Sequence, residues 1–224
     1  MSVTSVSLMI FAAGFGTRMG DLTQNTPKPL LDLAGRPMID HALEMAKDAK
    51  LETIFANTHY LHDTIAPHLR RRGVHVLHES AEILDTGGGL KAAREHLTNP
   101  TLTLNPDCDW AGPNPLSFLL DQWNQDMQSL LLLVPLDRAE NRSAPGDFSL
   151  NDTRLIRGGD MVYTGAQLIR TDRLDAIQDR VFSLNVYWDH LADTHDLHGA
   201  IYPGHWTDIG TKQALTKANR TKIV

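Results

Sequence analysis

Short apolar runs alternate with amphipathic segments in the first part of the chain, and the period of the apolar positions separates the two kinds. Consecutive apolar residues, which indicate buried strands, cover residues 5–12, 53–58, 74–78, 101–105 and 129–134. Apolar side chains at helical spacing predict helices at residues 38–50, 63–72, 88–97 and 115–125. Such a regular alternation is typical of βαβ units, which build a mostly parallel sheet.

The order of elements changes in the second part of the chain. Residues 147–150 and 153–156 flank Asn151-Asp152, a pair that favours a tight turn, so we expect a β-hairpin there. Further strands are expected at 163–169 and 197–202, and helices at 183–192 and 212–220. No linker or internal repeat divides the chain. The sequence therefore predicts a single α/β domain over residues 1–224, a Rossmann-like three-layer sandwich around a mostly parallel, mixed sheet.

Composition and charge narrow the class of protein. The chain has 224 residues, 42% of them apolar and 21% charged, which is ordinary for a globular protein with a sizeable core. A net charge of −6 argues against a nucleic-acid partner, since nucleic-acid binders present a basic face. A single cysteine, Cys108, excludes an internal disulfide and fits a reducing compartment. The first apolar run is too short for a bilayer and follows no Lys or Arg, so we expect a cytoplasmic protein without a signal peptide or membrane partner.

A glycine-rich turn follows the first apolar run and carries the clearest chemical signal. Gly14 and Gly16 let backbone amides approach a ligand closely, and Arg18 and Lys28, the latter between two prolines, supply cations. The turn is not a dinucleotide fingerprint, because Met19 stands where the third glycine belongs, and it lacks the Gly-Lys-Ser/Thr of a P-loop. We therefore expect a nucleoside triphosphate site at the end of the first strand.

These two motifs together resemble those of the nucleotidyltransferases that join a nucleoside triphosphate to a sugar 1-phosphate. Residues 85–89 look like the base-binding glycine loop of that family, and Asn105-Pro106-Asp107 is similar to its first metal motif. Residues 204–211 look like its second metal segment, so the resemblance covers nearly the whole chain. The short length and the sequence around residues 146–148 look most like the N-acetylmuramate 1-phosphate uridylyltransferases.

The resemblance implies an attack of the sugar phosphate on the α-phosphorus, with release of pyrophosphate. Arg18 would hold the β- and γ-phosphates, Lys28 the α-phosphate, and Asp107 and Asp208 a Mg²⁺ ion. The nucleotide-binding half is expected at about residues 1–110, and the half with the sugar and the second metal ligand at about 111–211. The candidate nucleotide-binding residues are Ala13, Gly14, Gly16, Thr17, Glu79, Gly87 and Gly88. The candidate sugar-binding residues are Asn105, Asp147, Gly165 and Trp206.

The chain departs from the family pattern at two places. Pro106 replaces the usual glycine of the first metal motif, and Asp109 offers a second carboxylate close to Asp107. The Glu-Lys-Pro segment whose lysine binds the sugar phosphate in larger relatives is absent, and Arg154 and Arg157 are the candidates to replace that lysine. The absence argues against the larger glucose 1-phosphate enzymes. Without a C-terminal repeat domain, we expect a monomer or a weak dimer.

Several readings stay open. UTP is favoured, but GTP with heptose or mannose 1-phosphate is an alternative, and CTP with phosphocholine is a third. Asp107-Cys108-Asp109 also fits the Asp-x-Asp motif of a UDP-sugar-dependent glycosyltransferase, which would have no use for the arginine turn. A non-catalytic nucleotide sensor is the remaining alternative, and Arg18, Lys28 and the two aspartates argue against it.

Overall fold

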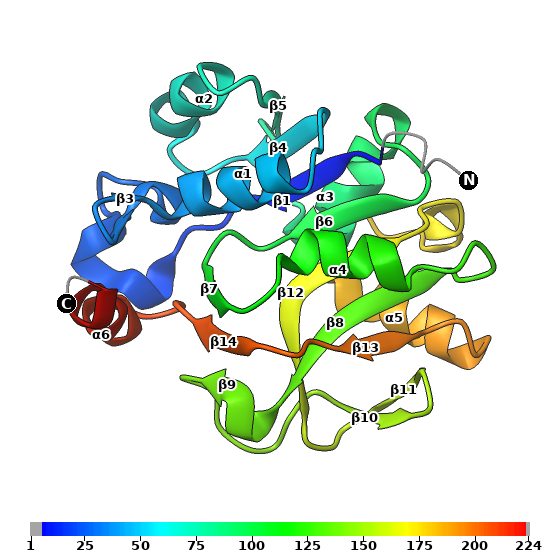
Figure 1. Ribbon diagram of the computed structural model, residues 1–224. Helices are drawn as coiled ribbons and strands as arrows, with labels where there is room; N and C mark the ends of the chain where they lie inside the picture. The colour runs from blue at the N-terminus through cyan, green and yellow to red at the C-terminus, as the bar shows by residue number, and fades with distance from the viewer. Residues whose placement is uncertain (1–5, 223–224) are drawn as a thin grey trace.

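The computed structural model describes residues 6–222, so the predicted start of the first strand at Ser5 lies outside the described residues. Within that part of the chain, a nine-stranded sheet has the order β11-β10-β12-β6-β1-β4-β5, with β8 beside β12 and β13 beside β8 (Figure 1). Its strands are β1 Leu8–Phe11, β4 Ile54–Thr58, β5 His75–His78, β6 Thr101–Leu104, β8 Ser129–Pro135, β10 Phe148–Asn151, β11 Arg154–Arg157, β12 Met161–Ile169 and β13 Gly199–Ile201.

The sheet is parallel in its first half and mixed in its second. Leu8 of β1 lies opposite Ile54 of β4 on one side and Leu102 of β6 on the other, and all three strands run the same way. β12 runs antiparallel to both β6 and β8, because the chain returns to the middle of the sheet after the 148–157 hairpin. The predicted α/β class is confirmed, and the sheet is mixed. The glycine turn follows β1, which lies in the parallel part of the sheet.

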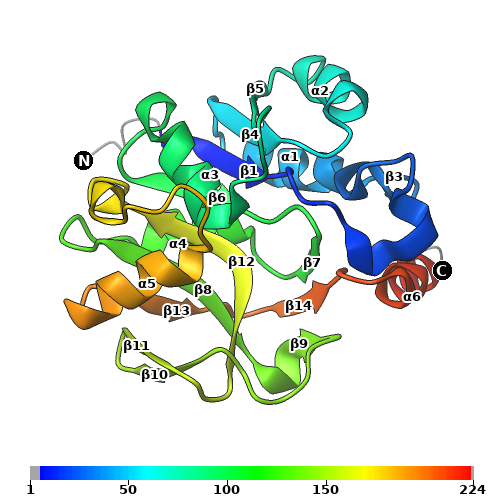
Figure 2. The same ribbon diagram turned by 180° about the vertical axis from the view of Figure 1, so that it is seen from behind.

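Helices cover both faces of the sheet, as the alternation of buried side chains requires. Leu8 and Ile10 pack against α1, α2 and α4, whereas Met9 points to the other face and packs with α3 and α5. Figures 1 and 2 show these two helical layers from opposite sides. The helices are α1 Met38–Asp48, α2 His62–Arg70, α3 Asp85–Ala93, α4 Pro115–Gln122, α5 Leu184–Asp193 and α6 Lys212–Lys222. The 3₁₀ helices are η1 Thr17–Thr23, η2 Lys28–Leu30, η3 Arg94–His96, η4 Leu136–Arg138 and η5 Leu174–Ala176.

A second, small sheet lies at the carboxyl edge of the large one. It consists of β7 Cys108–Ala111, β14 His205–Asp208 and β9 Ala139–Glu140, in the order β7-β14-β9. β14 is antiparallel to β7, with Asp208 opposite Cys108. A further pair of short strands, β2 Asp32–Leu33 and β3 Arg36–Pro37, precedes α1. The small sheet therefore brings the C-terminal segment beside the end of β6.

Helix α3 begins earlier than the periodicity predicts. It starts at Asp85 instead of residue 88, so the three glycines of the 85–89 segment form buried helical turns instead of a loop. A Cβ at Gly87 would come within 2.4 Å of the Phe182 ring, and one at Gly88 within 2.3 Å of the Arg180 carbonyl oxygen. The glycines let the 180–182 segment pack directly on the helix. No helix among residues 6–222 combines the length and the apolar character needed to cross a bilayer.

This packing predicts the effect of Gly88→Ala on stability. Alanine normally stabilises a helix by about 1 kcal/mol over glycine, but here its methyl group would collide with backbone. We expect a net loss of about 1–3 kcal/mol, seen as a melting temperature several degrees lower in a thermal unfolding experiment. Gly14→Ala is the control, because a Cβ there meets no atom within 4 Å. Equal melting temperatures for the two variants would contradict the packing role.

Candidate active site

The glycine turn between β1 and η1 is shaped to present backbone donors. Gly16 has a φ of 65°, and its carbonyl oxygen accepts hydrogen bonds from Thr23 Oγ1 at 3.1 Å and from the Met19 amide at 2.9 Å. Within the described part of the chain, the amides of residues 14–17 donate no hydrogen bond to another protein group. Consecutive unengaged amides form a concavity that attracts anions. The turn is therefore suited to hold phosphate groups.

Lys28 reaches the site because η2 packs against this turn. A Cβ at Gly16 would lie 2.9 Å from the Lys28 Cβ, so the close approach requires glycine at position 16. The Lys28 side chain is 11% exposed, and its Nζ forms an ion pair with Asp107 Oδ2. A mostly buried ammonium needs a negative partner. Asp107 is that partner in this structure.

The second aspartate joins this pair through the small sheet. β14 runs beside β7, and the Ile209 amide donates a hydrogen bond of 2.9 Å to the Asp107 carbonyl oxygen. Burial and the neighbouring charge of Asp107 raise the pKa of Asp208, while the positive charges of Arg18, Lys28 and Arg142 lower it. The net shift is upward. Two neighbouring carboxylates, of which Asp208 has a raised pKa, form a site that attracts a cation.

Gly210 allows the arginine of the turn to approach the second aspartate. A Cβ at Gly210 would lie 2.7 Å from Arg18 Nη1 and 2.8 Å from Asp208 Oδ1. Arg18 and Asp208 therefore face the same small space, one from the N-terminal turn and one from the C-terminal strand. Two carboxylates, Asp107 and Asp208, and two cations, Arg18 and Lys28, converge here.

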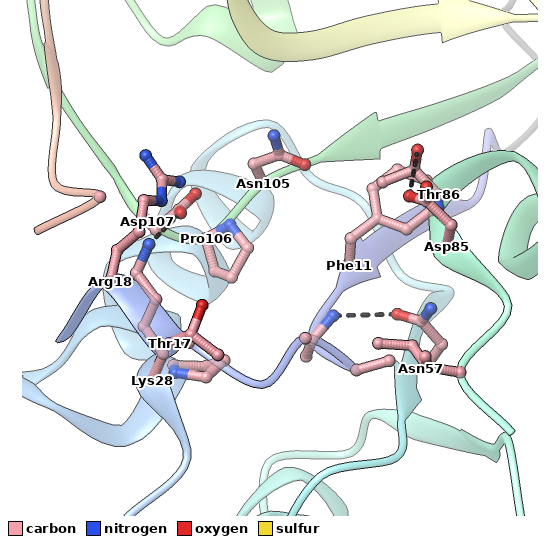
Figure 3. A pocket seen from close by; sticks show the side chains of 17 residues that line it. Phe11, Thr17, Arg18, Lys28, Asn57, Asp85, Thr86, Asn105, Pro106 and Asp107 are labelled. Carbon is pink, nitrogen blue, oxygen red and sulfur yellow. Dashed lines mark hydrogen bonds and ion pairs between the residues drawn. The ribbon is translucent and has the colours of Figure 1, made fainter. Parts of the chain in front are cut away.

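A cavity of about 280 Å³ opens from this charged cluster (Figure 3). Figure 3 shows Arg18, Lys28 and Asp107 at one end of it, and Asn57, Asp85 and Thr86 at the other. Its lining contains the predicted nucleotide-binding residues Ala13, Gly14, Gly16 and Thr17. It also contains residues that the sequence did not single out, namely Phe11, Asn57 and Ile83. One end of the cavity carries two cations and suits phosphates, and the other end, with Phe11, Asn57, Ile83 and Asp85, offers apolar surface and hydrogen-bonding groups that suit a base.

Glu79 does not line this cavity, but it is hydrogen-bonded to Asn57, which does. The Ala12 amide donates to Asn57 Oδ1 at 2.9 Å, and Asn57 Nδ2 donates to Glu79 Oε1 at 2.6 Å. The other Glu79 oxygen accepts from the Leu84 amide at 2.9 Å. A Cβ at Gly89 would touch both Asn57 and Glu79, so the third glycine leaves room for their hydrogen bond. The hydrogen bonds from Glu79 through Asn57 therefore hold the backbone at Ala12, which forms part of the cavity wall.

The structure does not place Gly87 and Gly88, the residues predicted to read the base, in the lining of this cavity. Both amides donate to the Phe182 carbonyl oxygen, at 2.9 and 3.0 Å, and neither glycine lines the cavity. The two residues before them do line it. Thr86 Oγ1 accepts from the Leu184 amide at 3.0 Å, and this bond joins the start of α3 to α5. The resemblance of residues 85–89 to a base-binding glycine loop does not reveal the 180–182 segment, which packs against these glycines.

A second cavity, of about 340 Å³, adjoins the first. Arg18, Thr86, Asn105 and Asp107 line both, so the two spaces meet at the charged cluster. All four predicted sugar-binding residues line the second cavity. They are Asn105, Asp147, Gly165 and Trp206. Aromatic rings of Phe148, Tyr163 and Trp188 complete its wall and suit the apolar faces of a sugar.

The structure distinguishes between the alternative arginines and aspartates that the sequence offered as candidates. Arg157 lines the second cavity, whereas Arg154 lines neither. Asp107 lines both cavities, whereas Asp109 lies opposite Thr207 in the small sheet and lines neither. Arg142 lines the second cavity and was missed by sequence reasoning, because a lone arginine in a loop carries no pattern. Burial raises the pKa of the Cys108 thiol well above its ordinary value, so the thiol stays protonated and is no nucleophile.

The residues present fit a magnesium ion better than a transition metal. Among residues 6–222, no group of three or more His, Cys, Asp and Glu side chains is arranged to hold a metal. Mg²⁺ is commonly bound by only one or two carboxylates together with substrate phosphates and water. Asp107 and Asp208 supply that donor set, with the phosphate turn beside them.

Comparison with known proteins decides the family. The pattern of the MobA-like NTP transferase domain matches residues 8–180. The chain belongs to this family. It is 32% identical to the N-acetylmuramate alpha-1-phosphate uridylyltransferase of Caulobacter vibrioides, over 97% of both chains. It is 27% identical to a mannose-1-phosphate guanyltransferase of Gibberella zeae, over 90% of this chain but only 60% of that protein. A UDP-glucose pyrophosphorylase solved with UDP-glucose has the same fold, with a TM-score of 0.81 and 12% identity over 98% of this chain and 99% of that one.

The protein is thus an enzyme of the sugar-1-phosphate nucleotidyltransferase type. Relatives in this family act on nucleoside triphosphates and sugar 1-phosphates, in agreement with the two joined cavities.

The position of Asp208 predicts opposite effects of Asp208→Asn on activity and stability. Because the pKa of Asp208 is raised in the folded protein, its ionised form is unfavourable there at neutral pH, and asparagine removes that cost. We expect a melting temperature that is unchanged or higher, together with the loss of magnesium-dependent pyrophosphate release. Asp126→Asn, at an exposed position outside both cavities, is the control, and it keeps both the wild-type melting temperature and the activity. A markedly lower melting temperature for Asp208→Asn would instead make Asp208 a structural residue.

Proposed function

We propose that this nucleotidyltransferase uses UTP and N-acetylmuramate 1-phosphate to form a UDP-sugar and pyrophosphate, with Mg²⁺ bound by Asp107 and Asp208. The nucleotide occupies the first cavity and the sugar phosphate the second. The first cavity is lined by residues before position 108 and by Gly210, and most of the second by later residues. This division supports a nucleotide-binding half at about residues 1–110 and a sugar-binding half at about 111–211.

One observation carries the proposal: the two cavities share a wall made of Arg18, Thr86, Asn105 and Asp107. A nucleotidyl transfer needs its two anionic substrates to meet at one phosphorus atom, and cations must offset their repulsion there. A glycosyltransferase needs no group for leaving pyrophosphate. The pairing of Arg18 with an unengaged phosphate turn favours the nucleotidyl transfer over that rival.

In this reaction, an oxygen of the sugar phosphate attacks the α-phosphorus of the triphosphate. The new P–O bond forms as the bond from the α-phosphorus to the oxygen bridging the β-phosphorus breaks, and that oxygen leaves with pyrophosphate. Arg18 binds the β- and γ-phosphates through its planar guanidinium and holds the leaving group. Lys28 binds the α-phosphate and offsets the charge that builds up on its oxygens.

The ammonium group of Lys28 exchanges one negative partner for another when substrate binds. In the free protein Lys28 is neutralised by Asp107, so the ammonium is already held at the junction of the cavities. When bound, Mg²⁺ supplies positive charge to the phosphates as a Lewis acid. Asp107 and Asp208 would hold this ion, and Lys28 would bind the α-phosphate. The ion pair is thus a preorganised state of the catalytic lysine.

The choice of UTP and of N-acetylmuramate 1-phosphate rests on the relative from Caulobacter vibrioides, which covers the full length of this chain. The second candidate is a guanylyltransferase that uses mannose or heptose 1-phosphate, favoured by the likeness to the Gibberella zeae enzyme. That likeness covers less than two thirds of the fungal protein, so it weighs less.

A panel of pyrophosphate-release assays tests the proposal. Each of four nucleoside triphosphates is combined with magnesium and with N-acetylmuramate, mannose, heptose or glucose 1-phosphate. Fastest release with UTP and N-acetylmuramate 1-phosphate is the expected result. Fastest release with GTP and mannose or heptose 1-phosphate would instead identify the protein as a guanylyltransferase. No release with any pair, from protein shown to be folded, would overturn both.

The assigned role of Lys28 predicts a large loss of turnover in Lys28→Ala. Removal of a single transition-state donor commonly lowers kcat by about two to three orders of magnitude, and we expect a loss of at least that size. Lys47→Ala, on the exposed side of α1, is the matched control. If Lys28→Ala folds and its kcat stays within about threefold of the wild-type value, Lys28 does not contact the α-phosphate.

A further inference from the structure

The second cavity needs a cation for the acceptor phosphate, and the chain lacks the lysine segment that supplies it in larger relatives. Three arginines line this cavity: Arg18, Arg142 and Arg157. Arg18 also lines the first cavity, beside the phosphate turn, and serves the triphosphate. The acceptor phosphate is therefore left to one of the other two.

Arg157 is already committed to the protein. Its Nε donates to Asp189 Oδ1 at 2.7 Å, and its Nη1 and Nη2 donate to the side chain and backbone of Asn185, both at 2.9 Å. Its guanidinium also lies 4.9 Å from the centre of the Phe148 ring. Each of its three nitrogens already has an acceptor, so Arg157 holds β11 against α5.

Arg142 has donors to spare. Its Nη2 donates to both Asp147 oxygens, at 2.8 and 3.0 Å, while within the described part of the chain no acceptor is assigned to its Nε or Nη1. The side chain is 33% exposed. An arginine with an unused edge of its guanidinium is suited to bind a phosphate through two parallel hydrogen bonds.

Asp147 holds this arginine in a fixed place. Its Oδ2 accepts from the Tyr163 amide at 2.9 Å, and its own amide donates to the Met161 carbonyl oxygen at 2.7 Å. The carboxylate is thus anchored to β12, and its hydrogen bonds to Nη2 hold the Arg142 guanidinium in a fixed orientation. Arg142 is also close enough to Asp208 for its charge to act on that carboxylate. Arg142 therefore lines the second cavity together with the carboxylate pair.

We propose that Arg142 binds the phosphate of the sugar 1-phosphate and that Asp147 positions Arg142 for this contact. The inference rests on the proposed function, since it assigns the acceptor site of that reaction. It replaces the missing lysine by a residue from another part of the chain, the loop after β9. It also gives Asp147 a role through Arg142 in place of the direct sugar contact expected from the sequence.

Equilibrium binding tests the inference without relying on turnover. Magnesium and a UTP analogue with a methylene bridge between the α- and β-phosphates fill the nucleotide site. Calorimetry then measures the Kd of N-acetylmuramate 1-phosphate and, separately, of glucose 1-phosphate. Loss of a charged hydrogen bond predicts a Kd at least about tenfold higher for Arg142→Ala, with an intermediate value for Arg142→Lys. Arg154→Ala, in the hairpin but outside both cavities, keeps the wild-type Kd.

Double variants separate positioning from direct contact. We expect Asp147→Asn to weaken binding of the sugar phosphate in the wild-type background and to have no further effect in Arg142→Ala. The Kd of the UTP analogue stays within about twofold in all of these variants, because none of them touches the first cavity. An additive effect of Asp147→Asn would show that Asp147 contacts the sugar itself and would overturn its positioning role.

The possible failures are distinguishable. If the wild-type protein binds a sugar phosphate and Arg142→Ala binds it equally well, the assignment of Arg142 is wrong and the proposed function stands. If the wild-type protein binds the UTP analogue but neither sugar phosphate, the proposed function is wrong. The assignment of Arg142 to the acceptor phosphate is then wrong as well.

Discussion

The repulsion between Asp107 and Asp208 is the constraint on which the site depends. Burial and the charge of Asp107 raise the pKa of Asp208, and the fold holds the two carboxylates together by pairing β14 with β7. Lys28 forms a direct ion pair with Asp107, and Arg18 approaches Asp208 across Gly210. The site therefore gathers two carboxylates and two cations in a small space, a composition suited to a divalent cation and a polyphosphate.

The sheet explains why the two cavities meet at this point. β1 and β6 are parallel neighbours, so the glycine turn after β1 and the Asn105–Asp107 segment after β6 leave the sheet at the same edge. β12 enters antiparallel beside β6, and Gly165 lies against Asn105, whose amide donates to the Gly165 carbonyl oxygen at 2.9 Å. A Cβ at Gly165 would be 2.9 Å from the Asn105 side chain, so this contact requires glycine. The second cavity opens where the parallel part of the sheet ends.

The sequence predicted those parts of the site that local patterns encode. Gly14, Gly16 and Arg18 lie in one short turn, and the structure places them in one cavity wall. The predicted helix boundary at residue 88 was wrong, because packing by Phe182, almost a hundred residues later, decides where α3 begins. Asn57 and Arg142 were missed for the same reason. Each is a single polar residue whose partners come from distant segments, and no periodicity or spacing marks it.

Phosphorus NMR of the complete reaction tests the central claim most directly, because it identifies the bond that breaks. The protein is mixed with magnesium, UTP and N-acetylmuramate 1-phosphate, and the spectrum is followed with time. The account predicts that the β- and γ-phosphorus signals of UTP convert to pyrophosphate, while the α-phosphorus and the sugar phosphorus become a coupled pair in one diphosphate product. Release of inorganic phosphate, or an α-phosphorus that ends in free UMP, would contradict it, since the enzyme would then hydrolyse the triphosphate rather than transfer its nucleotidyl group.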